Sequence, residues 1–355
     1  MIPRLYEKNA ITFTTYGICP LIDAISCEVT EERNGGYTLT MEYPREGRWA
    51  TEIIVDRIIL AKPHDNATSN QPFRIREVTF DMLGNMIVQA EHISYQLNNY
   101  IIGISSVSFT TAATMWTNMV AQHIAGSNPF TFSTDISTVK SLTMAIEQPT
   151  GLRALLGGTG GMVDVFGGEF EFDGYTVKLH SARGSNNGVK IAYSKNLTGL
   201  TYDIDMDGCV SAVVTYWSKE GQSAQNAQAT TNTYSYNRFA IVDVSNDYET
   251  KPNTATLQTY GQNWLAANAS APTLSVEVNF VPLWQTEEYK DFYALEHVNL
   301  CDTVEVLYPP LNIDVQAKVV RTVYDVLLER YTELTISTVK QSLADTIYDL
   351  MKGQK

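Results

Sequence analysis

Residues 299–337 read NLCDTVEVLYPPLNIDVQAKVVRTVYDVLLERYTELTIS, and our prediction of the fold starts from this stretch. Apolar and polar residues alternate through Thr303–Leu307, Val315–Leu327 and Glu333–Thr338, as they do in half-buried β-strands. The Pro309-Pro310 pair separates the first two of these segments, because proline cannot donate to a strand ladder. The stretch is therefore expected to form two or three strands of one β domain.

Successive residues of a strand point to opposite faces, so the central strand has two distinct faces. The alternation places Val315, Ala317, Val319 and Arg321 on one face and Gln316, Lys318, Val320 and Thr322 on the other. We expect one face to pack on a core and the other to meet a neighbour or a lumen.

The composition predicts a folded, mainly β chain. A length of 355 residues allows about two to four domains. Hydrophobic residues make up 44% and charged residues 18%, which is typical of chains that bury cores. The 20 tyrosines, together with many threonines and valines, favour strands, because aromatic and β-branched side chains fit a pleated sheet.

The chain is acidic, with a formal net charge of −14. Such a surface repels nucleic-acid phosphates and anionic lipid headgroups, which argues against a role in binding either. The simplest consequence of the charge is solubility.

Nothing in the sequence directs the chain to a membrane or an oxidising compartment. The N-terminal MIPRLYEKNA lacks the basic and apolar regions of a signal peptide, and no apolar run reaches the roughly 18 residues that span a bilayer. A soluble cytosolic product without membrane insertion is expected. Four cysteines without a zinc-type spacing predict buried, reduced thiols: Cys19, Cys27, Cys209 and Cys301.

Residues 1–98 are predicted to form a first β-barrel-like domain. Two alternating runs flank Asn34-Gly35-Gly36, which is a strong hairpin signal. A second strand pair is expected at Phe73–Phe80 and Met86–His92. Five or six strands with short turns fit a small barrel or sandwich.

Residues 99–188 are predicted to form an accessory α+β domain. A helix is expected within Thr110–Ile124 and a short one at Thr150–Leu156. Two strands follow, at Gly168–Phe172 and Thr176–Ser181.

Residues 189–245 and 274–339 are predicted to form a second, discontinuous β-barrel-like domain. Its strands include Ser211–Trp217 and Phe239–Val244, and the polar stretch Glu220–Asn232 between them predicts a mobile loop.

Two helices complete the predicted organisation. Residues 246–273 form a helical insertion, with its helix at Thr254–Ala269, which we assign to the accessory region. Residues 340–355 form a C-terminal amphipathic helix. Its apolar side carries Leu343, Ile347, Leu350 and Met351.

Two glycine-containing motifs suggest ligands but depart from the patterns that bind them. The run Asp203–Gly208, DIDMDG, resembles the start of a calcium loop, yet its twelfth position is Val214 where a glutamate is needed. A strand end followed by a turn is the favoured interpretation. The run Gly157–Gly161 lacks the Lys-Ser/Thr of a phosphate loop, so a flexible loop is expected.

Three carboxylates, Glu169, Glu171 and Asp173, alternate along one predicted strand. Glycoside hydrolysis uses two carboxylates that flank the scissile bond, but the sequence shows no opposed partner. We interpret the three as a solvent-facing strand edge.

The remaining motif search identifies no catalytic, cofactor-binding or metal-binding residue, and no cofactor is expected. No metal-ligand or serine-nucleophile pattern occurs. The histidines are isolated and are interpreted as ordinary polar residues: His64, His92, His123, His180 and His297. An enzyme would need a site assembled from distant segments.

Short segments along the chain form an ordered set: QPFRI at 71–75, AEHISY at 90–95, GGEFEFD at 167–173, RG at 183–184, KNL at 195–197, VPLW at 281–284, LEHVNLCDTV at 295–304 and AKVVRTVYDVLLERY at 317–331. As a set they resemble the phage minor structural proteins of siphophage-like tails, also called tail-associated lysin N-terminal regions or prophage endopeptidase tail proteins. Cys301 occupies a position that is commonly glycine in that family, so the turn there is expected to differ.

The resemblance implies a fold similar to the central hub of contractile tails. Each subunit would have two β-barrel-like tube domains and accessory domains, and three subunits would form a ring that matches a hexameric tail tube. The ring would close the tube and open for DNA or the tape-measure protein. The implied partners are two further subunits, the distal tail protein and the tail tube proteins. The implied location is the tip of a virion tail, assembled in the cytoplasm of a bacterial host.

A structural role without catalysis is our first hypothesis. Many relatives carry a peptidoglycan-cleaving domain downstream, and this chain stops at Lys355, so lytic activity is not expected of these residues. Two alternatives stay open: a cell-wall endopeptidase or glycosidase with a discontinuous site, and a carbohydrate-binding β module that touches the host surface. The net charge adds the hypothesis that a negative lumen keeps DNA from adsorbing as it passes.

Overall fold

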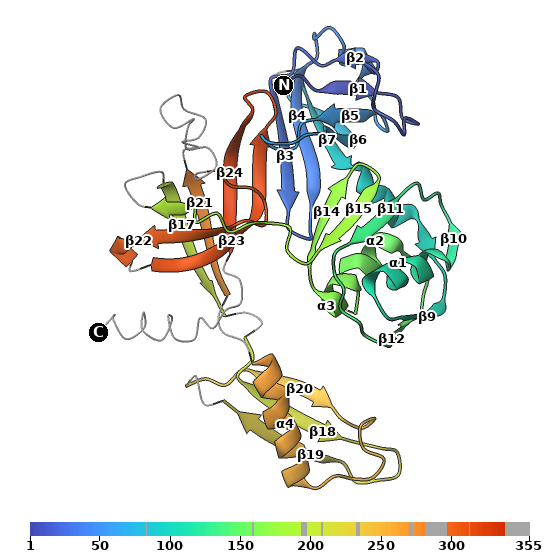
Figure 1. The fold of residues 1–355 in the computed structure, drawn as a ribbon, viewed down its shortest axis with the longest axis vertical. Coiled ribbons are helices and arrows are strands. Elements are labelled where there is room, and N and C mark those ends of the chain that lie inside the picture. The colour runs from blue at the N-terminus through green and yellow to red at the C-terminus, as the bar shows by residue number, and fades with distance from the viewer. Residues whose placement is uncertain are drawn as a thin grey trace. The chain divides into compact units, whose positions relative to one another are not determined.

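The computed structural model describes residues 1–82, 84–157, 160–192, 197–206, 209–231, 235–269, 273–280, 297–311 and 313–337. The chain divides into two compact units (Figure 1). The larger unit contains Met1–Leu200 and Glu277–Ser337, and the smaller contains Thr201–Val276. The predicted C-terminal helix at 340–355 lies outside the described residues.

The larger unit begins with seven antiparallel strands, and both predicted strand pairs are confirmed. β3 (Ser26–Glu32) and β4 (Tyr37–Pro44) form the hairpin expected around Asn34, whose φ of 56° lies in the left-handed region that Asn tolerates. β6 (Gln71–Phe80) pairs with β7 (Asn85–His92). The other three are β1 (Arg4–Tyr6), β2 (Cys19–Pro20) and β5 (Ile58–Ala61).

The C-terminal stretch forms the predicted strands β22 (Thr303–Tyr308), β23 (Ile313–Asp325) and β24 (Arg330–Ser337). β23 is 13 residues long and has two partners along one edge. Its first part pairs with β22, and Arg321–Asp325 pairs with β3. The N-terminal and C-terminal strands therefore belong to one sheet.

The N-terminal and C-terminal strands that the structure describes in the larger unit share one open sheet and do not form closed barrels. The strand order is β17-β21-β24-β23-β3-β4-β7-β6-β5-β1-β2, an open path that does not close on itself among the described strands. β17 is Leu197–Asp205 and β21 is Thr273–Phe280. The mainly β class is confirmed, whereas a closed barrel is not seen in the described part of the chain.

The predicted faces of β23 are correct only as far as Val319. Ala317 and Val319 are buried, but the register against β24 shifts between Val319 and Arg321, which marks a β-bulge. After the bulge Thr322 and Tyr324 are buried and Arg321 is not. The prediction that Arg321 shares a face with Val319 is wrong, because one extra residue reverses the alternation.

The middle of the chain forms a lobe of small sheets and helices around one apolar core. The predicted helix within 110–124 is α1 (Ala112–Val120), capped by the Thr111 side chain. The second is α2 (Leu152–Gly157), and α3 (Met162–Phe166) was not predicted. The predicted strands are β14 (Glu169–Asp173) and β15 (Thr176–His180).

Further short elements complete the larger unit, both in the lobe and beside the large sheet: η1 (Ala50–Glu52), η2 (Ile93–Asn99), β8 (Ile101–Ile102), β9 (Ser105–Phe109), β10 (His123–Ala125), β11 (Thr131–Thr134), β12 (Leu142–Ile146), β13 (Thr150–Gly151), β16 (Lys190–Ala192) and η5 (Pro309–Leu311). The lobe's core joins α1, α2 and β15 through Met115, Trp116, Leu152 and Leu179.

The smaller unit is a three-stranded sheet with one helix. β18 (Ala212–Trp217) lies between β19 (Gln225–Thr230) and β20 (Phe239–Asp243), and α4 (Thr254–Asn268) covers one face. α4 was predicted, and β18 and β20 occupy positions of strands that we assigned to the second barrel. The predicted loop at 220–232 is wrong in part, because it contains β19. The five-part division of the chain stays a prediction.

Candidate functional site

The charged strand β14 lies where the lobe meets the large sheet. Our interpretation of Glu169 as part of a solvent-facing strand edge is wrong, because the residue is 1% exposed. Its neighbours Glu171 and Asp173 are partly exposed, and each is held in hydrogen bonds. The three carboxylates therefore belong to a network and not to a free edge.

Glu169 accepts bonds from three segments of the chain. Its carboxylate lies 2.6 Å from Lys318 Nζ on β23 and 2.8 Å from Arg33 Nε after β3. The backbone N–H of Arg183 donates to it at 2.8 Å. Burial alone would raise the pKa of Glu169, but the Lys318 and Arg183 hydrogen bonds and the nearby cations hold it below its ordinary value. The carboxylate is thus ionised and structural.

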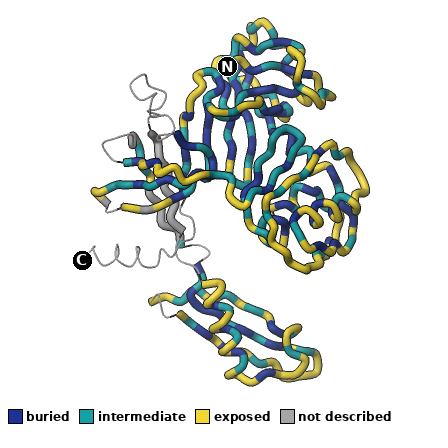
Figure 2. The backbone as a smooth tube through the Cα atoms, viewed as in Figure 1, coloured by how far each residue is buried: buried dark blue, intermediate teal, exposed yellow. Residues whose placement is uncertain are grey.

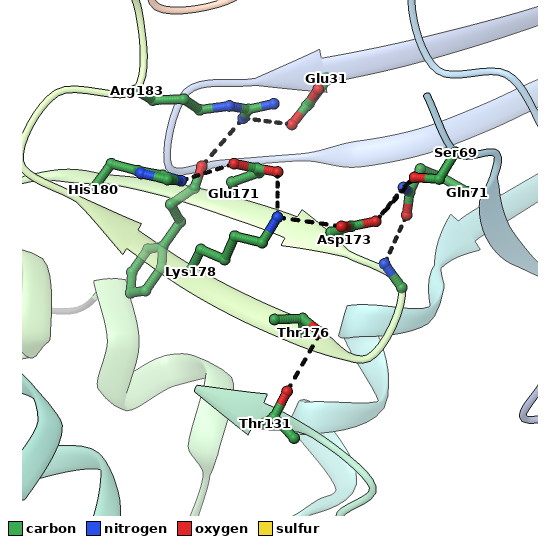
Figure 3. Close-up of polar contacts among 12 residues, drawn as sticks. Glu31, Ser69, Gln71, Thr131, Glu171, Asp173, Thr176, Lys178, His180 and Arg183 are labelled. Atoms are coloured by element: carbon green, nitrogen blue, oxygen red, sulfur yellow. Dashed lines mark hydrogen bonds and ion pairs between the residues drawn. The ribbon is translucent and has the colours of Figure 1, made fainter. Parts of the chain in front are cut away.

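Arg183 forms a second ion pair beside the first. Its guanidinium lies 2.6 Å from Glu31 Oε1 on β3, and it also donates to the carbonyl of Phe170 (Figure 3). Burial would lower the pKa of Arg183, but the adjacent Glu31 carboxylate more than offsets this and raises it. The pair links the loop after β15 to the central sheet.

Lys178 on β15 joins the other two carboxylates of β14. Its ammonium lies 2.9 Å from Glu171 and 3.2 Å from Asp173, and His180 Nε2 lies 2.7 Å from Glu171 (Figure 3). Asp173 also accepts from the amide of Gln71 at 2.9 Å. The hydrogen bonds from these donors outweigh burial and lower the pKa of both carboxyl groups.

His92 extends the network into the core. It is fully buried, contacts the side chains of Gln71 and Ser94, and stacks on Tyr37 at 4.4 Å between ring centroids. Burial, helped by the charge of Arg153, lowers the pKa of His92 to about 3. The imidazole is therefore neutral at physiological pH.

A polar cavity of about 250 Å³ opens beside these ion pairs. Its lining includes Glu31, His64, Arg183, Asn299 and Asp302. General acid catalysis needs a carboxyl whose pKa is raised, whereas Glu171, which also lines the cavity, has a lowered one. The Glu31–Arg183 pair and the Glu171–His180 contact place this cavity at the junction of the lobe and the sheet.

The turn before β22 forms one wall of this cavity. Cys301 has a φ of 71°, and the Asp302 carboxylate accepts from the backbone N–H groups of Asn299 and Ser185, each at 2.7 Å. Gly184 lies against the turn, and a Cβ there would be 2.1 Å from the Cys301 carbonyl carbon. The turn thus keeps the left-handed conformation that suits glycine, although a cysteine occupies it.

The other residues considered in the sequence analysis, the isolated histidines and the cysteines, do not cluster at one place among the described residues. His123 stacks on Tyr100, and His297 pairs with Asp65 at 2.7 Å. All four cysteines are buried, and none of them forms a disulfide. Among the described residues no group of His, Cys, Asp and Glu could hold a metal ion, and no helix could span a membrane. Part of the calcium-like run, Asp207 and Gly208, lies outside the described residues.

Known proteins resemble this chain at two levels, a family profile over part of the sequence and solved structures over nearly the whole chain. Residues 185–347 match the profile of the prophage endopeptidase tail family. A solved structure of prophage tail protein gp18 from Listeria monocytogenes EGD-e is similar over 99% of both chains, with 14% identity and a TM-score of 0.60.

The chain has the fold of a prophage tail protein.

Two further tail proteins agree with this assignment. The 43 kDa tail protein of prophage MuSo2 from Shewanella oneidensis covers 96% of this chain and 98% of its own, at 11% identity and a TM-score of 0.60. The tail protein from Neisseria meningitidis MC58 covers 97% of both, at 11% identity and 0.59. No curated protein sequence matches the chain. The resemblance drawn from sequence segments is therefore confirmed.

The sequence patterns did not predict this ion-pair network. Glu169 and Lys318 are 149 positions apart, and no periodicity connects them. One signal was present: both residues lie in segments of the family resemblance, GGEFEFD and AKVVRTVYDVLLERY.

Proposed function

We propose that this tail protein is a structural subunit of the tail tip, a baseplate hub that forms a homotrimeric ring at the distal end of the tail tube. The observation that carries the proposal is the whole-chain likeness to prophage tail proteins. The ring would open for DNA or the tape-measure protein. Its neighbours would be the distal tail protein and the tail tube proteins, in a virion tail assembled in the host cytoplasm.

The open sheet supports assembly with other chains. Among the strands that the structure describes, its path ends at β2 on one side and at β17 on the other. An edge strand presents backbone N–H and C=O groups that can pair with another chain, and closure into a ring removes such edges. The sheet of one subunit would in this way continue into that of the next.

One face of the central strands fits a lumen. On β3, β4 and β7 the core residues, such as Val29, Leu39 and Val88, alternate with partly exposed or exposed polar ones (Figure 2). The outward residues are Glu28, Thr30, Thr38, Thr40, Glu42, Gln89 and Glu91. They include three acids, of which Glu91 lies 3.5 Å from Arg76 of the neighbouring strand β6. The acidic excess would repel DNA phosphates and let the polymer pass without specific binding.

A non-enzymatic role is part of the proposal, and it needs a test because the matched family is named for an endopeptidase. The carboxylates of the β14 network are held in hydrogen bonds and ion pairs, and Glu169, Glu171 and Asp173 have lowered pKa values. Such groups brace strands and are poor proton donors. Purified protein should leave cell-wall peptidoglycan intact in a turbidity assay, and clearing that is lost in Glu171→Gln would favour the enzyme.

Deletion of the gene from a lysogen tests the role in assembly. Particles released after induction should lack a completed tail tip and should not infect, and expression of the chain in trans should restore both properties. Complete tails of normal infectivity without the protein would contradict the proposal.

A further inference from the structure

The chain contains two Asn-Gly pairs, Asn34-Gly35 and Asn187-Gly188. In such a pair the backbone nitrogen of the glycine can attack Cγ of the asparagine side chain, because glycine has no Cβ to hinder the approach. The new C–N bond closes a succinimide ring, and the side-chain nitrogen leaves as ammonia. Water then opens the ring at one of its two carbonyls, which gives aspartate or isoaspartate. The reaction needs no enzyme and no reagent except water.

The fold holds Asn34 in a conformation that opposes this reaction. Its side-chain oxygen accepts from the backbone N–H of Phe170 at 2.7 Å, and its side-chain nitrogen donates to the Gly168 carbonyl at 3.0 Å. The attacking atom is also engaged, because the Gly35 N–H donates to the Glu32 carbonyl at 3.1 Å. The Asn34 amide must therefore give up hydrogen bonds at both ends before its Cγ can reach the nitrogen of Gly35.

Asn187 lies in the opposite environment. It is exposed in the loop 185–188, and its side chain forms no hydrogen bond with any residue that the structure describes. Gly188 is also exposed, and a Cβ there would meet nothing within 4 Å, so the loop is open around the reacting atoms. The Gly188 N–H donates to the side chain of Asn186 at 3.1 Å, and that side chain is itself exposed. The Asn187 amide is thus free to turn towards the nitrogen of Gly188.

This loop is fixed to β22 at both of its ends. The Thr303 N–H of β22 donates to the Ser185 carbonyl at 2.9 Å. Two residues further along β22, the Glu305 N–H donates to the Val189 carbonyl, also at 2.9 Å. β16 begins directly after the loop and pairs with β22 in parallel. Isoaspartate carries the main chain through its side-chain carbon, which adds one atom to the backbone between these two anchors and would disturb both.

We propose that Asn187 is a site of spontaneous deamidation, that the fold protects Asn34 from the same reaction, and that isoaspartate at position 187 loosens β16 from β22. The same dipeptide thus has two fates in one chain, decided by the hydrogen bonds of the asparagine side chain. The inference does not depend on the proposed role in the tail.

Deamidation rates in the full-length protein test the first two parts. Folded protein and protein unfolded in guanidinium chloride are incubated in mildly alkaline water labelled with heavy oxygen, and peptide mass spectrometry follows both Asn-Gly pairs. The labelled oxygen marks residues that reacted during the incubation and not during digestion. Unfolding removes the hydrogen bonds of Asn34, so the unfolded chain is the matched control.

In the folded protein Asn187 should react at least about tenfold faster than Asn34. A tenfold ratio corresponds to about 1.4 kcal/mol, which is about what one intramolecular hydrogen bond contributes. In the unfolded chain the two rates should be similar. Equal rates in the folded protein would overturn the proposal, and so would a ratio that is the same in the folded and unfolded chains.

Hydrogen exchange tests the loosening of β16. Deamidated protein is separated from unreacted protein by ion exchange, and isoaspartyl methyltransferase labelling shows which fraction contains isoaspartate. In that fraction the backbone amides of residues 189–192 should exchange faster than in the Asn187→Asp variant. This variant is the matched control, because it gains the same charge and keeps the normal backbone. Equal exchange in the two proteins would overturn the effect on β16.

Discussion

Lys318 Nζ lies 2.6 Å from the buried Glu169 carboxylate, joining β23 of the large sheet to β14 of the lobe. The same carboxylate holds Arg33 at the end of β3. One side chain thus connects three segments that the sequence separates widely.

Removing this carboxylate should therefore destabilise the larger unit. Glu169→Gln leaves Lys318 without its buried counter-charge, and we expect a loss of about 3 kcal/mol or more in the free energy of unfolding. Chemical denaturation measures it. Glu171→Gln is the matched control, since that carboxylate is partly exposed and its loss should cost about 1 kcal/mol or less. Equal effects of the two changes would contradict the special role of Glu169.

The buried His92 should make stability depend on pH. Its folded-state pKa of about 3 is below the ordinary 6.5, so the unfolded chain takes up the proton first as pH falls. The stabilisation is complete above about pH 6.5 and decreases towards pH 3, by at most about 1.4 kcal/mol per pH unit. Denaturation at pH 7.0 and 5.5 should show this loss, and His92→Gln should reduce it. An unchanged pH dependence in the variant would show that His92 is not its source.

Glu329 offers a direct test of a surface ion pair. Hydrogen bonds from Lys62 and the N-terminal ammonium lower the pKa of Glu329 to about 2. In Lys62→Met the pKa of this carboxyl should rise towards its ordinary value of 4.5. Carboxyl-carbon NMR of glutamate-labelled protein follows the titration. If the pKa of Glu329 were the same in Lys62→Met as in the unchanged protein, Lys62 would not be the group that stabilises the carboxylate.

Gly184 should tolerate no side chain. A Cβ there would be 2.1 Å from the Cys301 carbonyl carbon, so Gly184→Ala should destabilise the protein by about 1–3 kcal/mol through displacement of the turn. Gly157→Ala is the control, because a Cβ at that position meets nothing within 4 Å and alanine favours the helix end. Thermal unfolding compares them, and a stable Gly184→Ala would contradict the close approach.

Sequence patterns predicted the elements better than their connections. Alternation identified β3, β4, β6, β7 and the C-terminal strands, and capping and spacing identified α1 and α4. β19 was missed because its small and amide side chains resemble a loop, although Ala227 and Ala229 are buried against α4.

These local patterns did not predict contacts between segments that are far apart in the sequence. The pairing of β23 with β3 joins residues some 290 positions apart, which local periodicity does not encode. The bulge at Val320 interrupts the pairing of β23 with β24, and the alternation of the sequence gives no sign of it. The ion-pair network around β14 was not predicted for the same reason. A run of alternating carboxylates is typical of an exposed edge, and only the fold brings Arg33, Arg183 and Lys318 to it.

The acidic face of the central strands yields a functional prediction. Glu28→Lys with Glu91→Lys places two cations where DNA would pass, so phage that carry the variant should eject DNA more slowly, with normal tail assembly. Fluorescent-dye ejection assays on purified particles measure the rate. Thr40→Gln on the same face is the neutral control, and an unchanged ejection rate in the lysine variant would contradict a lumen position.

Immunogold electron microscopy tests the tail-tip role most directly. A short epitope inserted at Gly221, in the exposed turn between β18 and β19, gives an accessible label. We expect the gold particles at the distal end of the tail in intact particles of phage. Gold along the tube or at the head, or particles that carry no protein, would contradict it.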